Sequence, residues 1–209
     1  MFKKAMKFMQ TKSDKRTRVI VFGLMLLGAT MGLLASFVLL MDKFLLDQDP
    51  NAVLACSVNI VLNCSTVMQS WQSDLLGFPN TVIGLMAFPV IITFALAGLA
   101  GIKFPRWWLI AANIGFLIDI LFSYWMLGQS LYVIQVLCPW CLSVTVASTV
   151  IFSTMLFYNL KQNVFHFKKA TDAKVQRFLA GGYFQMLVLS WIAFLVVLVF
   201  LQFGKALFA

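Results

Sequence analysis

Residues 19–41 read VIVFGLMLLGATMGLLASFVLLM, an apolar run without a charged side chain. A transmembrane helix needs roughly 20 consecutive, mostly apolar residues to cross a hydrocarbon core of about 30 Å. This run is long enough to do so. It is also about twice as long as the apolar region of a secretory signal peptide, and no small-x-small cleavage site with a polar mature sequence follows it. We therefore expect the run to stay attached as a membrane anchor.

Four further apolar runs are of similar length, at residues 81–100, 107–127, about 134–158 and 183–203. Hydrophobic residues make up 62% of the chain, against roughly 45–50% in soluble domains. Backbone polar groups inside a bilayer must be satisfied within each spanning segment, which favours helices, and the alternating pattern of strands is absent. The sequence predicts an all-α integral membrane protein with five transmembrane helices, four in a bundle and the fifth at its periphery.

Basic residues are distributed unevenly among the connections between these runs. One side of the membrane is expected to hold fourteen of the sixteen Lys and Arg residues: Lys3, Lys4, Lys7, Lys12, Lys15, Arg16, Arg18, Lys103, Arg106, Lys161, Lys168, Lys169, Lys174 and Arg177. The positive-inside rule then places the N-terminus in the cytoplasm and the C-terminus outside. Basic residues at the ends of spans set topology and meet anionic lipid, so the net charge of +9 does not call for a nucleic-acid partner.

The chain divides into four parts on this pattern: a basic cytoplasmic tail (1–18), a four-helix bundle (19–158) with a long outer loop (42–80), a basic cytoplasmic connection (159–182), and a fifth transmembrane helix with a short tail (183–209). Gly28 and Gly32 are four residues apart, a spacing that permits close helix packing. Val67, Met68, Trp71 and Leu75 recur in the loop at roughly helical spacing. They form either a short amphipathic helix along the membrane surface or a packed loop.

All four cysteines fall on the outer side of the predicted topology. Cys56 and Cys64 lie in the outer loop, while Cys138 and Cys141 lie near the start of the fourth span. Disulfides form and persist in such outer compartments. A metal site, a structural disulfide and a redox-active dithiol could each use this set.

The metal and structural explanations each meet a physical difficulty. Four thiolates around Zn²⁺ carry net negative charge beside hydrocarbon, and no Lys, Arg or His lies near Cys138 and Cys141 in sequence. Copper(I) suits Cys and Met ligands, but the eleven methionines are scattered through spans, where Met is ordinary packing material. A disulfide between Cys138 and Cys141 would close almost no chain and would stabilise little. We assign no metal ligands, and a Cys/Met metal-handling protein remains an alternative.

Pro139, between the two cysteines of the fourth span, favours redox chemistry. Proline is tolerated in the first turn of a helix and disruptive in its interior. If the helix begins here, Cys138 is at its cap and Cys141 in its first turn, where the helix dipole lowers the pKa of a thiol while burial raises it. If the helix begins at Ile134, Pro139 is a kink residue and the dipole has less effect.

An ordered set of short motifs resembles a known family. The set is Cys56-x7-Cys64, Cys64-x-x-Val67-x-x-Ser70, Gly77-Phe78-Pro79-Asn80-x-x-x-Gly84 and Leu137-Cys138-Pro139-Trp140-Cys141. A Cys-x-x-Cys pair alone is weak, whereas this combination on five spans is specific. From about residue 19 to 158 the chain resembles the vitamin K epoxide reductase family, whose bacterial members are quinone-coupled enzymes that form disulfides.

The resemblance implies a role for each cysteine. Cys56 matches the cysteine that exchanges with a reduced partner protein, and Cys64 the one that shuttles to the helix pair. Cys138 matches the cysteine that Cys64 attacks or is linked to, and Cys141 the one that reacts with quinone, either ubiquinone or menaquinone.

Two polar residues match positions near the quinone of the family. Asn80 matches an asparagine that hydrogen-bonds a quinone oxygen, and Ser70 matches a loop serine near the pocket. Each has another explanation, since Asn80 can be the N-cap of the second helix and Ser70 can cap or solvate the loop segment.

The resemblance also implies a setting. We expect a bacterial inner-membrane protein, active at its outer face as a monomer, with a thioredoxin-fold, DsbA-like partner. Many bacterial members continue into a thioredoxin-like domain, whereas this chain ends at Ala209, so the partner should be a separate protein. Animal members have a tyrosine where this chain has Thr145, so epoxide reduction is not implied. A DsbB-type oxidase has similar chemistry but carries its Cys-x-x-Cys in the first outer loop.

Asp119 lies within the third span, about 15 Å by helical rise from its outer end. A carboxyl group inside the membrane is a candidate functional residue. It could relay protons to a reduced quinone, or it could serve helix packing through Ser123, Asn113 or polar groups of a neighbouring helix. We favour the packing explanation on the sequence alone.

Overall fold

The computed structural model describes residues 2–54, 56–57 and 61–207, and these residues are mostly helical. The elements are α1 (Phe2–Gln48), α2 (Cys64–Met68), the 3-10 turn η1 (Trp71–Asp74), α3 (Asn80–Ala100), α4 (Arg106–Gly128), the π-helical turn η2 (Gln129–Ile134), α5 (Pro139–Lys161), α6 (Lys169–Ala180) and α7 (Tyr183–Leu207). Within the described residues there is no strand beyond one isolated bridge, between Leu62 and Leu137. The prediction of an all-α protein is confirmed.

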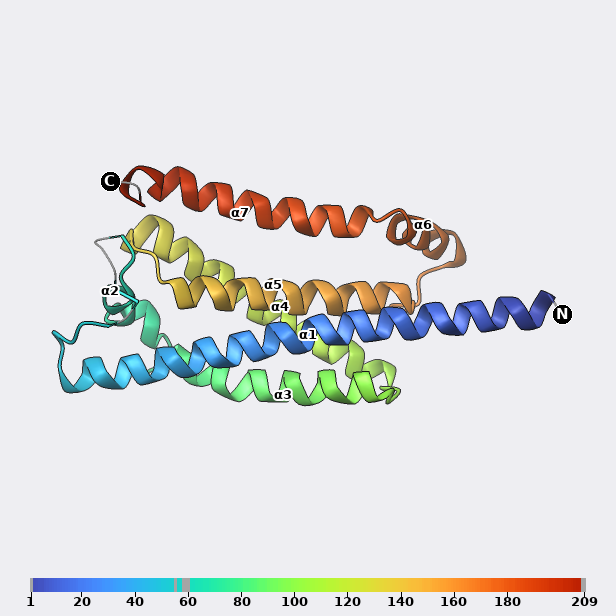
Figure 1. Cartoon of the computed structure of the whole chain (residues 1–209), viewed down its shortest axis with the longest axis horizontal. Coiled ribbons are helices and arrows are strands. Elements are labelled where there is room, and N and C mark those ends of the chain that lie inside the picture. The colour runs from blue at the N-terminus through green and yellow to red at the C-terminus, as the bar shows by residue number, and fades with distance from the viewer. Residues whose placement is uncertain (1, 55, 58–60, 208–209) are drawn as a thin grey trace.

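Five helical segments of the described residues are long and apolar enough to cross a membrane, which confirms the predicted number. They are Lys15–Gln48, Asn80–Ala100, Arg106–Ile134, Pro139–Lys161 and Tyr183–Gly204. In Figure 1 the first four run side by side as a bundle, and α7 runs along its margin next to α5. The apolar window of α7 is 0% buried inside the protein, which agrees with the predicted peripheral position. The loop with α2 and the end of α7 lie at one end of the bundle, and the N-terminus lies at the other.

An aromatic layer holds the bundle together in the half that lies away from the cysteines. Phe22 of α1 has its ring centroid 5.1 Å from that of Tyr158 in α5 and 5.7 Å from that of Phe94 in α3. Phe94 in turn lies 4.4 Å from Phe104, in the connection that follows α3. Offset and edge-to-face aromatic pairs contribute about 0.5–1.5 kcal/mol beyond the area they bury. This layer gives α3 and α5 a fixed position against α1.

Two glycines allow close contact on α1, as the spacing of Gly28 and Gly32 predicts. A Cβ atom at Gly28 would lie 3.4 Å from the Ala147 carbonyl oxygen of α5. A Cβ atom at Gly32 would overlap the ring of Phe88 in α3. Phe88 is only 2% exposed, so its ring has little room to move away. The two glycines therefore place α5 and α3 against α1.

Replacing Gly32 by alanine is expected to destabilise the bundle, because the added methyl group overlaps the buried ring of Phe88. Overpacking of this kind costs about 1–3 kcal/mol. The measurement is the thermal unfolding midpoint of purified protein in detergent. Gly23→Ala on the same helix is the matched control, since a Cβ there meets nothing within 4 Å. Equal midpoints for the two variants would contradict the argument.

The start of the fourth transmembrane helix decides between the two alternatives for Pro139. α4 continues through η2 to Ile134, and Gln135 then adopts a left-handed conformation with φ 57°. Residues 136–138 lie outside any helix, and α5 begins at Pro139 with the extended residue Cys138 as its N-cap. Pro139 is therefore a first-turn residue and not a kink. The predicted span of about 134–158 began several residues too early, because hydropathy does not detect a short turn between two apolar helices.

The outer loop does not form one amphipathic helix. α2 and η1 are separated at Gln69 and Ser70, and Val67 and Met68 are only 3% and 5% exposed. Trp71 is 66% exposed. The loop is thus packed against the bundle, and Val67 and Met68, the first two residues of the periodic pattern, are buried. The basic connection also contains the amphipathic helix α6. The sequence analysis did not predict α6, because the helix is too polar to form an apolar run.

Candidate active site

The outer loop is fastened to the chain segment just before α5. The Leu137 amide donates to the Val61 carbonyl at 2.7 Å, and the Asn63 amide donates to the Leu137 carbonyl at 3.1 Å. Leu137 is only 1% exposed, so these backbone bonds form in a buried setting. Asn63 also caps α2, its side chain accepting from the Thr66 amide. Because Cys64 and Cys138 each follow a residue of this short bridge, the bridge places the two cysteines side by side.

The cysteines form an outer disulfide next to a pair of free thiols. Cys56 and Cys64 are joined by a disulfide, whereas Cys138 and Cys141 are free. Cys138 Sγ lies 3.5 Å from Cys64 Sγ. Both of these residues are buried, at 1% and 0% exposure. A thiolate at Cys138 is therefore next to a disulfide sulfur that it could attack, which is the arrangement needed for thiol–disulfide exchange.

Cys138 occupies an N-cap position that favours its thiolate. Its sulfur accepts a hydrogen bond from the Cys141 backbone amide at 3.4 Å. Hydrogen bonding by the Cys141 side chain, together with the backbone amides at the start of α5, lowers the pKa of the Cys138 thiol below its usual value, although burial acts in the opposite direction. The sequence predicted the opposed effects of the helix start and of burial on this pKa, but not the hydrogen bond with the Cys141 side chain, which has the largest effect on it.

Charged residues of α1 border the disulfide and hold the loop above it. Asp42 Oδ2 lies 3.6 Å from Cys56 Sγ. Lys43 donates to the Met68 carbonyl and forms an ion pair with Asp74, both at 2.9 Å. Asp42, Lys43 and Asp74 were not predicted as residues of the site. No local signal marks them, because their contacts exist only once the loop has folded back over the end of α1.

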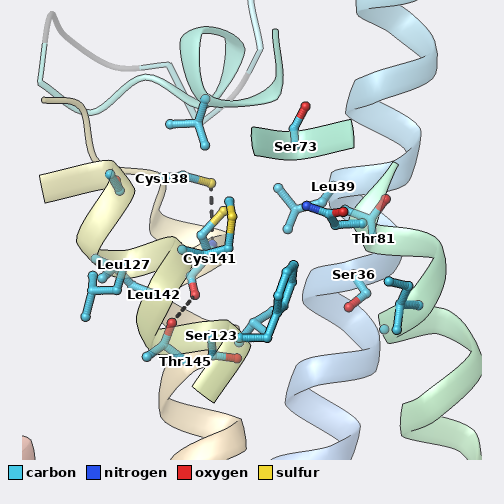
Figure 2. Close-up of a pocket in the computed structure, with 18 of the residues that line it drawn as sticks. Ser36, Leu39, Ser73, Thr81, Ser123, Leu127, Cys138, Cys141, Leu142 and Thr145 are labelled. Atoms are coloured by element: carbon cyan, nitrogen blue, oxygen red, sulfur yellow. Dashed lines mark hydrogen bonds between the residues drawn. The ribbon is translucent and has the colours of Figure 1, made fainter. Parts of the chain in front are cut away.

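A largely apolar cavity opens beside the free thiols, at the same end of the bundle (Figure 2). It encloses about 150 Å³, the size at which an engineered apolar cavity in another protein binds benzene. Figure 2 shows Cys138, Cys141 and Thr145 on one side of it and Ser36 and Thr81 across from them. The full lining is Ser36, Leu39, Val67, Met68, Ser73, Asn80, Thr81, Ile83, Gly84, Ala87, Phe88, Asp119, Phe122, Ser123, Met126, Leu127, Ser130, Cys138, Cys141, Leu142, Val144 and Thr145.

Asn80 lines this cavity and does not cap its helix. The N-cap of α3 is Pro79, without a side-chain cap bond, and the preceding turn requires Gly77, whose φ is 80°. Asn80 Nδ2 donates to the Gln72 carbonyl at 2.6 Å. Its Oδ1 atom is buried without a hydrogen-bond partner. The capping explanation for Asn80 is therefore wrong, and its amide has bonding capacity left for a ligand.

Ser70 stands outside the cavity lining, and another serine takes its place. Ser70 Oγ donates to the Val67 carbonyl at 2.6 Å. Ser73, one turn further on, lines the cavity, and its hydroxyl donates to the Met68 and Ser70 carbonyls. The sequence analysis missed Ser73, whose exposure to the cavity depends on the break between α2 and η1. A ligand role for Ser70 stays a prediction.

Thr145 also faces the cavity, from the second turn of α5. Its hydroxyl donates to the Cys141 carbonyl at 3.0 Å, so it is satisfied within its own helix. A tyrosine at this position, as in animal members of the family that the sequence resembles, would project a ring into the space that Thr145 leaves open. The small side chain thus adds to the volume beside Cys141.

A quinone ring fits the chemistry of this cavity. Ligand sites are typically apolar clefts with a few polar groups that set orientation, and three buried oxygens of lining residues, Asn80 Oδ1, Thr81 Oγ1 and Asp119 Oδ2, have no partner. The thiol of Cys141 borders the same space. Among the described residues no group of three or more His, Cys, Asp or Glu side chains is placed to hold a metal ion.

Comparisons with known proteins agree with the arrangement of the cysteines. A search of curated proteins finds no match. A sequence profile of the vitamin K epoxide reductase family matches residues 23–156. The matched segment runs from α1 to α5 and contains the outer disulfide, the free thiol pair and every residue that lines the cavity. Because this match covers more than half of the chain, the protein belongs to the vitamin K epoxide reductase family.

Proposed function

We propose that this protein re-oxidises a thioredoxin-fold protein outside the membrane and passes the electrons to quinone, thereby supporting disulfide formation. Its family consists of quinone-linked thiol oxidoreductases. The observation that carries the proposal is the 3.5 Å distance between Cys138 Sγ and Cys64 Sγ, with Cys141 at the edge of the apolar cavity. An outer disulfide, an inner thiol pair and an apolar ligand cavity thus follow one another in space.

The exchange moves two electrons and two protons at each step. The partner's dithiol becomes a disulfide, and the Cys56–Cys64 disulfide becomes two thiols. These thiols then reduce a disulfide between Cys138 and Cys141, with Cys64 attacking Cys138. The described state has the outer pair oxidised and the inner pair as thiols. It corresponds to the stage at which the inner pair holds the electrons.

The cavity residues would bind and orient the acceptor, ubiquinone or menaquinone. A quinone supplies a sink for two electrons and two protons when it is bound. Cys141 would approach it from α5 and the Asn80 amide from α3, while the apolar walls formed by residues such as Phe88 and Phe122 would exclude water. Ser70 would contribute to quinone binding through the loop that carries it. Within this loop the Ser73 hydroxyl is the better candidate for a direct contact with the quinone, because Ser73 lines the cavity.

We propose an orientation in which the cysteine end faces outward from a bacterial inner membrane. Disulfides persist in oxidising compartments, and the Cys56–Cys64 disulfide lies at this end. The connections at the opposite end carry Lys103, Arg106, Lys161 and Lys168, as the positive-inside rule requires for a cytoplasmic face. We also propose that the protein acts as a monomer and that its partner is a separate protein.

The DsbB-type alternative fits less well than the proposed assignment. That topology carries its Cys-x-x-Cys in the first outer loop, whereas here this pair begins α5, the fourth transmembrane helix. The family match across residues 23–156 supports the same conclusion.

The test is a coupled assay with purified protein in detergent. Wild-type protein is mixed with a reduced DsbA-like protein and ubiquinone-1 or menadione, and loss of quinone is followed by absorbance. We expect quinone loss that matches the partner's oxidation mole for mole. If no partner with a thioredoxin fold supports quinone loss, the proposal is wrong. Stoichiometric bound metal with no exchangeable thiols would indicate the metal-handling alternative instead.

A further inference from the structure

A carboxyl group lies in the cavity, and the thiol exchange makes no use of it. Asp119, in the middle of α4, lines the cavity together with Cys141 and Asn80. Its Oδ2 atom is buried and has no hydrogen-bond partner. A polar group left unpaired in a membrane interior costs free energy. A role within the cavity would explain why this helix position is a carboxyl and not an apolar side chain.

The rest of the Asp119 side chain is held in place by serines. The Ser148 side chain on α5 interacts with the Asp119 carboxyl, and Ser123 Oγ donates to Ser148 Oγ at 3.3 Å. Ser148 and Ser123 are 0% and 6% exposed. Asn113 is engaged elsewhere, since its Oδ1 accepts from Asn159 Nδ2 at 3.3 Å. The contacts with the serines therefore leave Oδ2 of Asp119 free for a ligand.

Few other groups near this carboxyl can gain or lose a proton. Of the described residues that line the cavity, Asp119 is the single one with an acidic or basic side chain, and the other titratable groups are the thiols of Cys138 and Cys141. α1 contributes Ser36 and Leu39, and α3 contributes neutral residues such as Asn80 and Thr81. Among the described lining residues, the acid–base groups that can supply a proton to a bound quinone are thus the thiol pair and Asp119.

We propose that Asp119 is the proton-transfer residue of quinone reduction, a role that rests on the proposed function. The Asp119 carboxyl donates its proton to one oxygen of the acceptor and regains a proton from the inner thiol pair. Two S–H bonds break, one S–S bond forms between Cys138 and Cys141, and two electrons and two protons reach the quinone, which leaves as quinol. Asp119 ends with the proton that it began with, so no further reactant is required.

The test compares Asp119→Asn with wild type in a single turnover. Asparagine keeps the size of the side chain and can still bond to Ser148, but it cannot pass on a proton. Fully reduced protein is mixed rapidly with ubiquinone-1 over a range of pH. General acid–base catalysis contributes typically about 10²–10⁴-fold, and we expect Asp119→Asn to slow the reaction by that factor and to flatten its pH profile. Asp119→Glu, which keeps a carboxyl group, should reduce quinone at least about tenfold faster than Asp119→Asn. Gly115→Ala, on the same helix with nothing within 4 Å of the added Cβ, is the control.

A second readout needs no quinone. Infrared difference spectra between the dithiol and disulfide states of the inner pair should contain a carboxyl C=O band that Asp119→Asn removes, because Asp119 is protonated in both states and its surroundings in the cavity change when the two thiols become a disulfide. Partner-thiol exchange at Cys56 and the thermal unfolding midpoint should stay at wild-type values in the same variant.

Three results would overturn the inference. Asp119→Asn could reduce quinone at the wild-type rate at every pH. The variant could lose partner exchange and thermal stability in parallel with quinone reduction, which would indicate a packing role. The infrared band could also be absent from wild type. If wild type itself fails to reduce quinone with any partner, the proposed function fails instead, and the infrared result still reports on Asp119 separately.

Discussion

Replacing Cys141 by alanine is expected to reduce quinone reduction to the background rate, and Cys138→Ala is expected to do the same. Loss of a group that reacts covalently in a coupled set removes nearly all of the catalysis, on the order of 10⁴-fold or more. The inner pair is the only dithiol that borders the cavity among the described residues, so no other thiol can replace it. The measurement is steady-state quinone loss with the reduced partner.

The state of the outer cysteines in Cys141→Ala provides a second measurement. With Cys141 absent, the Cys138 thiol can still attack Cys64, 3.5 Å away. We expect a Cys64–Cys138 disulfide and a free Cys56 thiol, identified by mass spectrometry after alkylation. Ser143→Ala is the matched control, because Ser143 bonds only to the Pro139 carbonyl and does not line the cavity. Unchanged turnover in Cys138→Ala or Cys141→Ala would refute the proposed electron path.

Replacing Cys64 by alanine should also abolish turnover, and in addition it should trap the partner. Without Cys64 the Cys56 thiol is free to attack the disulfide of the oxidised partner, which forms a mixed disulfide and releases one partner thiol. Cys64 is the neighbour that would resolve this adduct, and Cys138 lies against Cys64. We expect the adduct on non-reducing gels, with the linkage to Cys56 identified by peptide mapping.

The double variant Cys56→Ala with Cys64→Ala is the control for this trapping. It keeps the inner pair and the cavity but has no outer thiol, so it should form no adduct. An adduct that persists in the double variant, or that maps to Cys138, would place the entry of electrons at the inner pair and contradict the assigned order. Both results are read from the same gel.

The predicted fold agrees with the structure because its signals are local. Each span is long enough to cross a bilayer by itself, so five apolar runs predict five helices without any knowledge of their contacts. Pro139 likewise predicts a helix start within its own segment, and α5 does begin there. The errors lie at boundaries: η2 and the non-helical residues before Cys138 divide an apolar stretch that hydropathy treats as continuous.

The site required more than local signals. The motif of Asn80 points to the cavity, but its bond to Gln72 and its unpartnered oxygen arise from the fold of the loop. Ser73 within η1 lines the cavity, whereas Ser70, the N-cap residue of η1, does not. The sequence identifies Asp119 as an acidic residue in a transmembrane span, but not its neighbours. Of its two predicted packing partners, Ser123 bonds to Ser148 beside Asp119, whereas Asn113 bonds to Asn159.

By itself, the sequence determined the membrane class, the number of spanning helices and the presence of all four cysteines near one end of the bundle, since hydropathy and charge are properties of each segment. Only the tertiary structure decided which sulfur meets which. Cys64 and Cys138 are 74 residues apart in the chain, and they meet because the buried backbone bonds of Leu137 with Val61 and Asn63 hold the loop against the start of α5. Such bonds depend on two distant segments being brought together, and no pattern within either segment encodes them.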